Sequence, residues 1–569
     1  MNLQVGKSNG RDYLVIVHGY RDPVTKKVRH KAIKSLGYLD DLKKQYPDPI
    51  AHFRAVVEEM NREAALEKQE ATINLDPKAT LPPVGTSRKN IGYAAISKLY
   101  HELGLHVFFG NNSRAFKSSF NTNNIMKLLI YSRILFPASK KKTHEAKNLY
   151  FENNEFSLDD IYRCLTQVVT FKDKLQKHLH RQMKDKYGRT TELVFYDVTN
   201  YYFEIDKQDA LRRKGVSKEH RPDPIVQMGL LMDTKGIPVK YDLFPGNTND
   251  CETLLPILDT VKKEYEIGRT IVVADKGINS ADNIAYCLAK GDGYIYSQTI
   301  RGANKELKDY VLDPRRYKET EDGFRIKSRL DPREIAVSNA HGGRTKIRVD
   351  EKQVIFYSPD YDRKAKRDRE QAILKAKDLI RNPSKYNKAI SYGAAKYIKN
   401  LVFDSKTGEI VTTKGKPVFD EAKLREEEEF DGYYAIVTSE WKKSDDKIIE
   451  IYRGLWRIEE AFKVTKSDLE TRPVYLSRED HIQAHFLICF VALVLLRLLA
   501  LNLDNKYSVS KIIDSLSKMS GSFLEENWYV FDYADEVTQD IAKTLGTDLS
   551  RKYLKVGEIK SMIAATKKL

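Results

Sequence analysis

The spacing of apolar residues changes several times along the chain, and each change marks a predicted element. In residues 12–37, the segments DYLVIVHGY and VRHKAIKSL flank the turn-forming stretch RDPVTKK, a pattern that predicts a β-hairpin. Residues 50–68 contain helix-forming residues throughout and predict a helix. The proline-rich stretch LDPKATLPPVGTS then predicts a linker.

From residue 88 to about residue 186 the pattern is helical. Apolar residues recur at helical spacing in IGYAAISKLYHELGL and NNIMKLLIYSRILF. The segment SLDDIYRCLTQVV opens with Ser157 three residues before Asp160, which is the spacing of a helix capping box. Basic residues recur through the block, as in SKKKTHEAK. A basic helical block suits DNA binding, and a purely structural layer of helices is the alternative.

Near-continuous apolar segments begin at Thr191. ELVFYDVTNYYFE predicts a strand that ends near Asp197, and IVQMGLLMD and PVKYDLFPG predict two more strands joined by the turn TKG. RTIVVADKG predicts a fourth strand that stops at Asp275, and GYIYSQT predicts a fifth. With the helical segments CETLLPILDTVKKEY and SADNIAYCLAKG, the order is β-β-β-α-β-α-β. Such apolar strands are typical of a sheet that helices cover on both faces.

After residue 299 the regular alternation of strands and helices stops. Residues 300–430 are charged, with short strands such as KQVIFYSP and a basic helical stretch. The strand pattern returns in DGYYAIVTS (431–439), and a helix that contains YRGLWRIEEAFKVTK follows it. Residues 300–430 are therefore interpreted as an insertion into an α/β domain.

The net charge points to a class of partner. The 569 residues include 97 Lys and Arg against 80 Asp and Glu, a formal charge of +17 with a pI of about 9.2. An excess this large favours a polyanionic partner, of which nucleic acid is the commonest, although a merely basic protein would show it too. Residues 361–400 alone carry twelve Lys or Arg against four Asp or Glu. This stretch is a candidate DNA clamp, and a solvated surface is the alternative.

Two further features concern the cellular setting. The cysteines are far apart and form no C-x-x-C pair, which favours a reducing cytoplasm over a disulfide framework or a zinc site. The run FLICFVALVLL has 11 residues, too few to span a bilayer, so it predicts a buried helix. We therefore expect a cytoplasmic protein with no membrane partner.

Acidic residues stand at three notable places in these elements. Asp197 ends the first strand of the α/β region and Asp275 ends the fourth. Glu459 or Glu460 lies on the late helix. Because neighbouring strands lie about 4.8 Å apart, acids at two strand ends can share a cation, and a helix across those ends can add a third ligand. Carboxylates without nearby His or Cys favour Mg²⁺, or Mn²⁺ in its place, and two such ions clamp a phosphodiester.

Each candidate ligand also has an ordinary interpretation. An Asp after a strand often caps the next turn, and a helical Glu is usually solvated. Only their joint occurrence, in this strand order and in a basic chain, favours a site. His481 and His485 lie four residues apart in HIQAH, which is a weak metal signal without an H-E-x-x-H motif, so packed histidines are favoured there.

The stretches YDVTN, ADKGINSADN and YRGLWRIEEAFKVTKSDLETRPVY resemble the three catalytic segments of bacterial insertion-sequence transposases. They resemble the branch of DDE enzymes that carries a Tyr-Arg-Glu-Lys signature. FPGNTND, DHIQAHFLICFVAL, LGYLDD and SRILFPASK are also similar to that branch, so the similarity covers most of the chain. The resemblance implies an α/β chain with an RNase H-like catalytic core, a mixed five-stranded sheet flanked by helices, and an inserted subdomain. The N-terminal β-hairpin and helical DNA-binding regions would lie outside that core.

The resemblance also implies the chemistry and the partners. Asp197, Asp275 and Glu459 would be the catalytic residues and would hold two Mg²⁺ ions, with Mn²⁺ as a substitute. The partners would be double-stranded DNA, both element ends and target, and a second copy of the chain in a homodimeric synaptic complex. The location would be the bacterial nucleoid. A catalytically inactive DNA-binding protein and an RNase H-like nuclease without strand transfer are the alternatives.

The signature itself departs from the family pattern at one position. Tyr452, Glu459 and Lys466 fit it, but Leu455 stands where the Arg is expected. The expected contacts to DNA phosphates come from Tyr452, Arg453, Arg457 and Lys466, with one of the two arginines replacing the missing one.

Helix geometry distinguishes the two glutamates. Residues 452, 459 and 466 are seven apart and would share one face of a continuous helix. Glu460 is rotated by about 100° from that face. We therefore expect Glu459 to be the ligand and Glu460 to pair with a cation.

The predicted organisation divides the chain into seven regions. They are an N-terminal hairpin plus helix (1–75), a linker (76–87), a helical DNA-binding domain (88–188), the first part of the core (189–299), an inserted basic subdomain (300–430), the second part of the core with the catalytic helix (431–505) and a C-terminal helical region (506–569).

Overall fold

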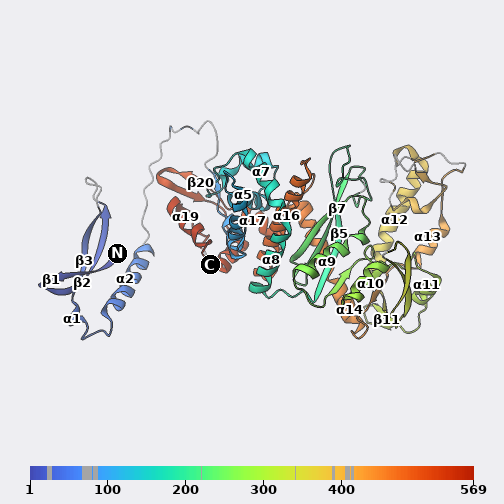
Figure 1. The fold of residues 1–569 in the computed structure, drawn as a ribbon, viewed down its shortest axis with the longest axis horizontal. Helices are drawn as coiled ribbons and strands as arrows, with labels where there is room; N and C mark the ends of the chain where they lie inside the picture. Colours follow the sequence, from blue (N-terminus) through green and yellow to red (C-terminus); the bar gives the residue numbers. More distant parts are fainter. Residues whose placement is uncertain are drawn as a thin grey trace. The chain divides into compact units, whose positions relative to one another are not determined.

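The structure is a computed structural model, and it forms two compact units, Met1–Leu81 and Pro82–Leu569 (Figure 1). It describes residues 1–21, 28–66, 78, 80, 88–219, 221–339, 341–386, 391, 393–403, 410–411, 415–546 and 548–568. Most of the predicted linker and the turn of the predicted hairpin lie outside these residues.

The first unit is a small antiparallel sheet with a helix. Strands β2 (Arg11–Arg21) and β3 (Val28–Tyr38) pair antiparallel, which confirms the predicted hairpin. Strand β1 (Asn2–Ser8) adds a third strand beside β2. After the short helix α1 (Leu39–Leu42), helix α2 (Pro49–Leu66) occupies the predicted helical segment.

The second unit begins with the helical block that the sequence predicts. Its helices are α3 (Tyr93–Glu102), α4 (Leu105–Ser113), α5 (Thr122–Leu135), α6 (Lys140–Glu145), α7 (Leu158–Val169) and α8 (Lys172–Tyr187). At the start of α7, the Ser157 hydroxyl accepts from the Asp160 N–H and the Asp160 carboxylate accepts from the Ser157 N–H. This confirms the capping box.

A nine-stranded mixed sheet forms the centre of the unit, in the order β10-β11-β14-β19-β9-β8-β5-β6-β7. The first five strands along the chain are β5 (Leu193–Tyr202), β6 (Ile225–Asp233), β7 (Pro238–Pro245), β8 (Ile271–Ala274) and β9 (Gly293–Gln298). Helix α9 (Leu254–Glu264) precedes β8 and helix α10 (Ala281–Ala289) precedes β9. The predicted order β-β-β-α-β-α-β is confirmed.

The sheet is larger than the five strands expected. Strand β19 (Tyr433–Thr438), which lies in the predicted strand DGYYAIVTS, pairs antiparallel with β9. Three strands from the predicted insertion continue the sheet, namely β14 (Lys352–Tyr357), β11 (Arg325–Leu330) and β10 (Lys318–Glu319). The pairing of β9 with β19, more than a hundred residues apart, leaves no local sequence signal, which explains the wrong strand count.

The rest of residues 300–430 forms small elements around that extension. They are helix α11 (Lys305–Leu312), the strand pair β12 (Arg333–Ser338) and β13 (Arg344–Val349), helix α12 (Pro359–Arg381), the strand pairs β15 (Ile398–Lys399) with β18 (Val418–Phe419) and β16 (Val402–Phe403) with β17 (Ile410–Val411), and helix α13 (Glu421–Glu428). Helix α12 holds most of the basic stretch 361–400, and residues 387–390 and 392 of that stretch are outside the described part.

Helices cover both faces of the sheet, as its apolar strands predict. Alternate residues of β5 belong to different cores: Val194 and Tyr196 pack with α9 and α10, whereas Phe195 packs in the other core. That second core includes helices α14 (Asp445–Arg453), α15 (Trp456–Lys463) and α16 (Glu479–Asn502). Because side chains alternate along a strand, every second residue of β5 from Phe195 onward faces α14 and α15.

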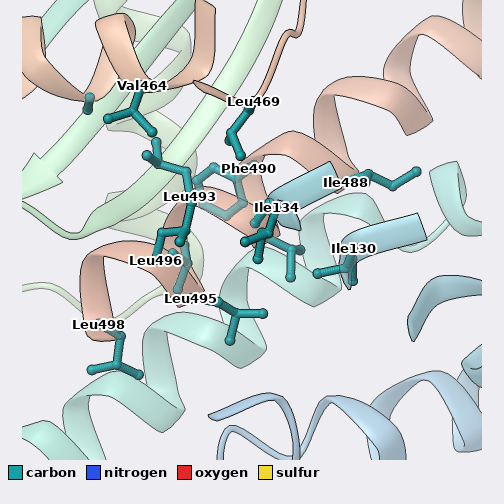
Figure 2. Close-up of a cluster of buried hydrophobic side chains, with 14 of the residues drawn as sticks. Ile130, Ile134, Val464, Leu469, Ile488, Phe490, Leu493, Leu495, Leu496 and Leu498 are labelled. Atoms are coloured by element: carbon teal, nitrogen blue, oxygen red, sulfur yellow. The ribbon is translucent and has the colours of Figure 1, made fainter. Parts of the chain in front are cut away.

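Helix α16 is the central element of the larger core. Figure 2 shows Phe490 and Leu493 of α16 beside Ile134 of α5, with Val464 and Leu469 from the segment that follows α15. The helix has 24 residues, more than the expected apolar run of 11, so length and composition alone would let it cross a membrane. However, 94% of its apolar window is buried inside the protein, which is typical of a core helix, and no other such helix occurs in the described part of the chain.

The C-terminal region contains strands as well as the expected helices. Helices α17 (Val509–Lys518), α18 (Glu536–Leu545) and α19 (Val556–Ala565) accompany a four-stranded sheet in the order β22-β21-β20-β4. Its strands are β20 (Ser520–Leu524), β21 (Trp528–Phe531), β22 (Tyr553–Lys555) and β4 (Lys89–Asn90). The expectation of a purely helical region is therefore wrong. Its strands are short. Strand β4 pairs with β20 although the two are more than 400 residues apart in the sequence.

Candidate active site

The direction of the strands places several polar residues at one edge of the sheet. Strands β5, β8 and β9 run parallel, and β7 runs the same way because two antiparallel steps separate it from β5. Their carboxyl ends therefore meet at one edge. The parallel pairing of β5 with β8 ends at Tyr196 and Ala274, and the next residue on each strand is an aspartate. Asp197 and Asp275 are thus neighbours, on the sheet face that α14 and α15 cover.

Asp197 lies within β5, which continues to Tyr202 beside β6 rather than ending at the aspartate as expected. Its Oδ1 accepts from the Val198 N–H at 2.7 Å and lies 4.0 Å from the Lys218 Nζ. Burial raises the pKa of Asp197 to about 6, against the lowering effect of Lys218, and the charges of Asp275 and Asp250 add to the rise. The site therefore disfavours a bare negative charge at Asp197.

Asp275 is more exposed and has two hydroxyl partners. Its Oδ1 accepts from the Ser297 hydroxyl at 2.6 Å and from the Tyr452 hydroxyl at 3.3 Å. Burial raises the pKa of Tyr452, and the neighbouring Asp275 charge raises it further, so the phenol stays protonated and acts as a donor. In this structure Tyr452 therefore orients Asp275.

The signature segment is not one continuous helix, and the expectation of a single shared face is wrong. Tyr452 is near the end of α14, whereas Lys466 lies in the π-helix η6 (Val464–Asp468) that follows α15. The break falls at Gly454, where a Cβ atom would lie 2.4 Å from the Phe195 ring of β5. The backbone at Gly454 thus passes too close to the sheet for a side chain.

Glu459 is exposed on α15 and, among the described residues, forms no hydrogen bond with either aspartate. Burial raises the pKa of Tyr434 on β19, and the charges of Asp275 and Glu459 are among those that add to the rise, so both carboxylates lie near that phenol. Among the described residues, no three His, Cys, Asp or Glu side chains are grouped closely enough to hold a metal ion. The structure therefore brings Asp197 and Asp275 together, with Glu459 on the same side but apart from the pair.

Lys466 lies close to the aspartate edge. Its Nζ is 3.1 Å from Glu219 Oε1 and lies over the Tyr201 ring at 5.6 Å. Burial lowers the pKa of Lys466 to about 8, the Lys218 charge lowers it further, and Asp197 opposes the change. The other carboxylate oxygen of Glu219 pairs with Arg472. Lys466 therefore lies at the aspartate edge, held by Glu219.

The two arginines expected to replace the signature arginine lie elsewhere. Arg453 stacks over the Phe324 ring at 5.2 Å, and Arg457 stacks over the Trp456 ring at 5.1 Å. Within the described part of the chain, neither forms an ion pair with Asp197 or Asp275.

The two remaining expectations about the signature region concern Glu460 and the histidines. Glu460 pairs with Arg497 at 2.9 Å, which confirms that it binds a cation. His481 and His485 are buried, in line with packed histidines.

Four further residues at this edge are not predicted from the sequence. Lys218 and Glu219 lie on the loop between β5 and β6, and Lys218 is also 3.7 Å from Asp250, which follows β7. Ser297 is the fourth, on β9. The loop residues follow no periodic pattern, so nothing local marks them. Asp250 is the last residue of FPGNTND and follows β7, which runs parallel to β5. This position at a strand end could have identified it from the sequence.

The comparisons with known proteins bear directly on this arrangement. Residues 205–495, just over half of the chain, match the family model of the transposase DDE domain. The chain belongs to the DDE transposase family. Residues 4–71 match the N-terminal domain of IS1634 family transposases, so this is a transposase of the bacterial insertion-sequence type. The DDE match includes Asp275 and Glu459 and begins after Asp197.

Two solved transposase structures are similar at a low level. The piggyBac transposase synaptic complex with hairpin DNA is 8% identical, with a TM-score of 0.33 and with 84% of this chain and 85% of that chain covered. The Mos1 transposase paired-end complex with the left transposon end is 13% identical, with a TM-score of 0.13, 29% of this chain and 56% of that chain. Both scores are too low to carry an argument about the fold. The comparison with curated proteins gives no match.

The transposase family generally uses divalent metal ions, and the donor set at the sheet edge fits one. Asp197 and Asp275 offer carboxylate oxygens, which are the ligands that Mg²⁺ prefers. The Lys218 ammonium lies between Asp197 and Asp250, so this position already favours positive charge. The two aspartates are therefore suitable ligands, and Glu459 would have to approach them to complete the set.

Proposed function

We propose that this transposase binds the ends of its insertion sequence, cleaves them by metal-dependent phosphodiester hydrolysis and joins the freed 3′-OH ends to target DNA. The observation that carries the proposal is the pair Asp197 and Asp275, adjacent on parallel strands and facing the helix of Glu459. We propose further that β5 to β9 with their helices are an RNase H-like core, because their order and directions are those expected for it.

In this mechanism, the chain's own residues position DNA and hold the reacting charges. Asp197, Asp275 and Glu459 would hold two Mg²⁺ ions, which would stabilise the attacking and leaving oxygens of the in-line displacement. Tyr452 keeps the Asp275 carboxylate oriented through its hydroxyl. Lys466 would bind a phosphate next to the scissile bond after leaving Glu219.

Substitution of the acids tests this proposal. We expect Asp197→Ala, Asp275→Ala and Glu459→Gln to bind DNA that carries the element ends but to lose strand cleavage by roughly 10³-fold or more, because each would remove a metal ligand. Glu450→Gln is the matched control, since Glu450 is an exposed glutamate on α14 that pairs only with Lys447. Cleavage is measured on end-labelled DNA with Mg²⁺. Normal cleavage by any of the three variants would refute the site.

The products of the same reaction test the second half of the proposal. Joining of cleaved ends to a target plasmid supports transposition, whereas cleavage without joining would indicate a nuclease. We also propose that the active form is a homodimer on two DNA ends. Measuring the mass of the complex with one end and with two ends tests this point.

A further inference from the structure

A cavity of about 320 Å³ lies between the helical block and the segment that follows the signature. It is lined by residues of α5, α6 and α16 and of the segment 470–476, including Arg133, Lys140, Arg472 and Tyr475. Its size is in the range of small-ligand pockets, roughly 300–1,000 Å³. It is separate from the carboxylates of the proposed active site, none of which lines it.

Lys140 is the unusual residue in this cavity. Its side chain is buried, with 5% of the residue exposed, and it forms no ion pair with a carboxylate among the described residues. Its Nζ has one polar neighbour, His485 Nδ1 at 3.4 Å. Burial lowers the pKa of Lys140 to about 7, and the nearby Arg133 lowers it further. A buried ammonium without a counter-charge is costly, and buried charges in proteins are normally paired.

The neighbours of Lys140 do not supply the missing negative charge. His485 Nε2 lies 3.1 Å from the Thr471 carbonyl, which can only accept, so Nε2 carries the proton and Nδ1 accepts from Lys140. The Arg133 guanidinium donates to the carbonyls of Leu469, Glu470 and Ala138, and its buried Nε has no partner. Two buried basic groups therefore line one cavity, and the acid that also lines it, Glu470, is exposed and forms no ion pair with either of them among the described residues.

The cavity is connected to the proposed active site by a chain of charges. Arg472 lines the cavity and pairs with Glu219, and Glu219 also holds Lys466 beside Asp197. At the same cavity Tyr475 exposes 75% of its surface, an aromatic ring available for stacking. A DNA strand held by Lys466 would thus pass Arg472 on its way to the cavity.

We propose that this cavity binds one nucleotide of the DNA strand, with its phosphate at Lys140 and Arg133 and its base stacked on Tyr475. The proposal rests on the proposed function, because it takes DNA as the ligand. The phosphate supplies the negative charge that the two buried cations lack. It would also offset the cost of burying Lys140 without a counter-charge.

The test uses the full chain without metal, so that binding is separated from cleavage. The probe is a labelled DNA duplex with a short single-stranded extension, and binding is followed by fluorescence anisotropy in EDTA. We expect Lys140→Met to weaken binding about 10-fold, the effect of losing a charged hydrogen bond. Lys142→Met is the matched control, because Lys142 is exposed on the same helix and does not line the cavity. We expect it to change binding less than about 2-fold.

Stability measurements separate a ligand-binding lysine from a structural one. If Lys140 is kept for a phosphate, Lys140→Met raises the Tm of the free protein, and inorganic phosphate raises the Tm of the wild type but not of the variant. A lowered Tm in Lys140→Met would make the lysine structural and overturn the proposal. Loss of the phosphate effect with unchanged DNA binding would also overturn it, because the cavity would then take a free anion.

A second variant keeps the proposal testable if Lys140→Met does not fold. Tyr475→Ala changes an exposed residue at the cavity, and we expect roughly 5-fold or greater weakening of binding from lost stacking. Unchanged binding by Tyr475→Ala would count against the nucleotide. If the wild type binds DNA and both variants bind it as tightly as the wild type does, only the nucleotide-binding cavity is refuted. If the wild type does not bind DNA at all, the proposed function is refuted as well.

Discussion

Lys218 balances negative charge at the proposed metal site. The Lys218 ammonium donates to the Val198 carbonyl and lies beside both Asp197 and Asp250. It therefore stabilises two carboxylates that would otherwise repel each other at the sheet edge. Glu219, the next residue, forms ion pairs with Lys466 and Arg472 and so reduces the repulsion between these two cations. Two loop residues thus neutralise the charges that metal and DNA would neutralise in the working enzyme.

The pH dependence of metal binding tests this view of Lys218. Because the pKa of Asp197 is raised to about 6, its carboxylate is mostly ionised above pH 6 and protonated below it. We expect the apparent affinity for Mn²⁺, measured by calorimetry, to fall as the pH drops through about 6. Since Lys218 lowers the pKa of Asp197, Lys218→Met should move this midpoint to higher pH.

Lys214→Met is the control for that midpoint. Lys214 lies on the same loop, is exposed, and is not among the charges that act on Asp197. We expect it to leave the midpoint unchanged. Equal midpoints for Lys218→Met and the wild type would show that Lys218 does not compensate the charge of Asp197.

At the scale of elements, the junction between α14 and α15 decides where Glu459 lies. Gly454 passes so close to β5 that a Cβ atom would lie 2.4 Å from the Phe195 ring and 2.9 Å from the Ile451 carbonyl oxygen. Phe195 is two residues before Asp197 on the same strand. The junction thus sets the height of α15 over the two aspartates, and a side chain at residue 454 would push the helix away.

Gly454→Ala tests this role. We expect overpacking to cost about 1–3 kcal/mol of unfolding free energy, seen as a lower Tm, and to reduce strand cleavage because Glu459 is displaced. Gly557→Ala is the matched control, since that glycine lies in helix α19 with nothing within 4 Å of an added Cβ. There the change should be neutral or stabilising by up to about 1 kcal/mol. An unchanged Tm in Gly454→Ala would show that the junction can adjust.

The same elements show what the sequence could predict and what it could not. The order of β5 to β9 was predictable because each strand is a short apolar run bounded by turn residues. The pair Asp197 and Asp275 followed from that order. The break at Gly454 was not predictable, because its cause is a ring on a strand more than 250 residues earlier. The addition of β19, β14 and β11 to the sheet likewise depends on pairing between distant segments.

At the scale of the whole molecule, positive charge gathers on the basic helix α12. Several of its basic residues form ion pairs, as Lys366 does with Asp362 and Arg369 with Asp431. Others are exposed and have no ion pair in the described part of the chain, namely Lys364, Arg367 and Arg381. Exposed cations on one long helix are the expected footprint of a surface that follows a DNA backbone.

The salt dependence of DNA binding decides whether α12 is such a clamp. Each phosphate contact releases bound counterions, so the logarithm of the binding constant falls with the logarithm of salt concentration by about 0.9 per contact. Replacing Lys364, Arg367 and Arg381 with Gln should therefore lower the slope by up to about 2.7.

Replacing Lys552, Lys560 and Lys568, which are exposed in the C-terminal region, removes the same charge elsewhere. We expect that control to leave the slope nearly unchanged. Equal slopes for the wild type and the α12 variant would make the helix a solvated surface, and equal losses in both variants would mean that total charge, not α12, holds the DNA.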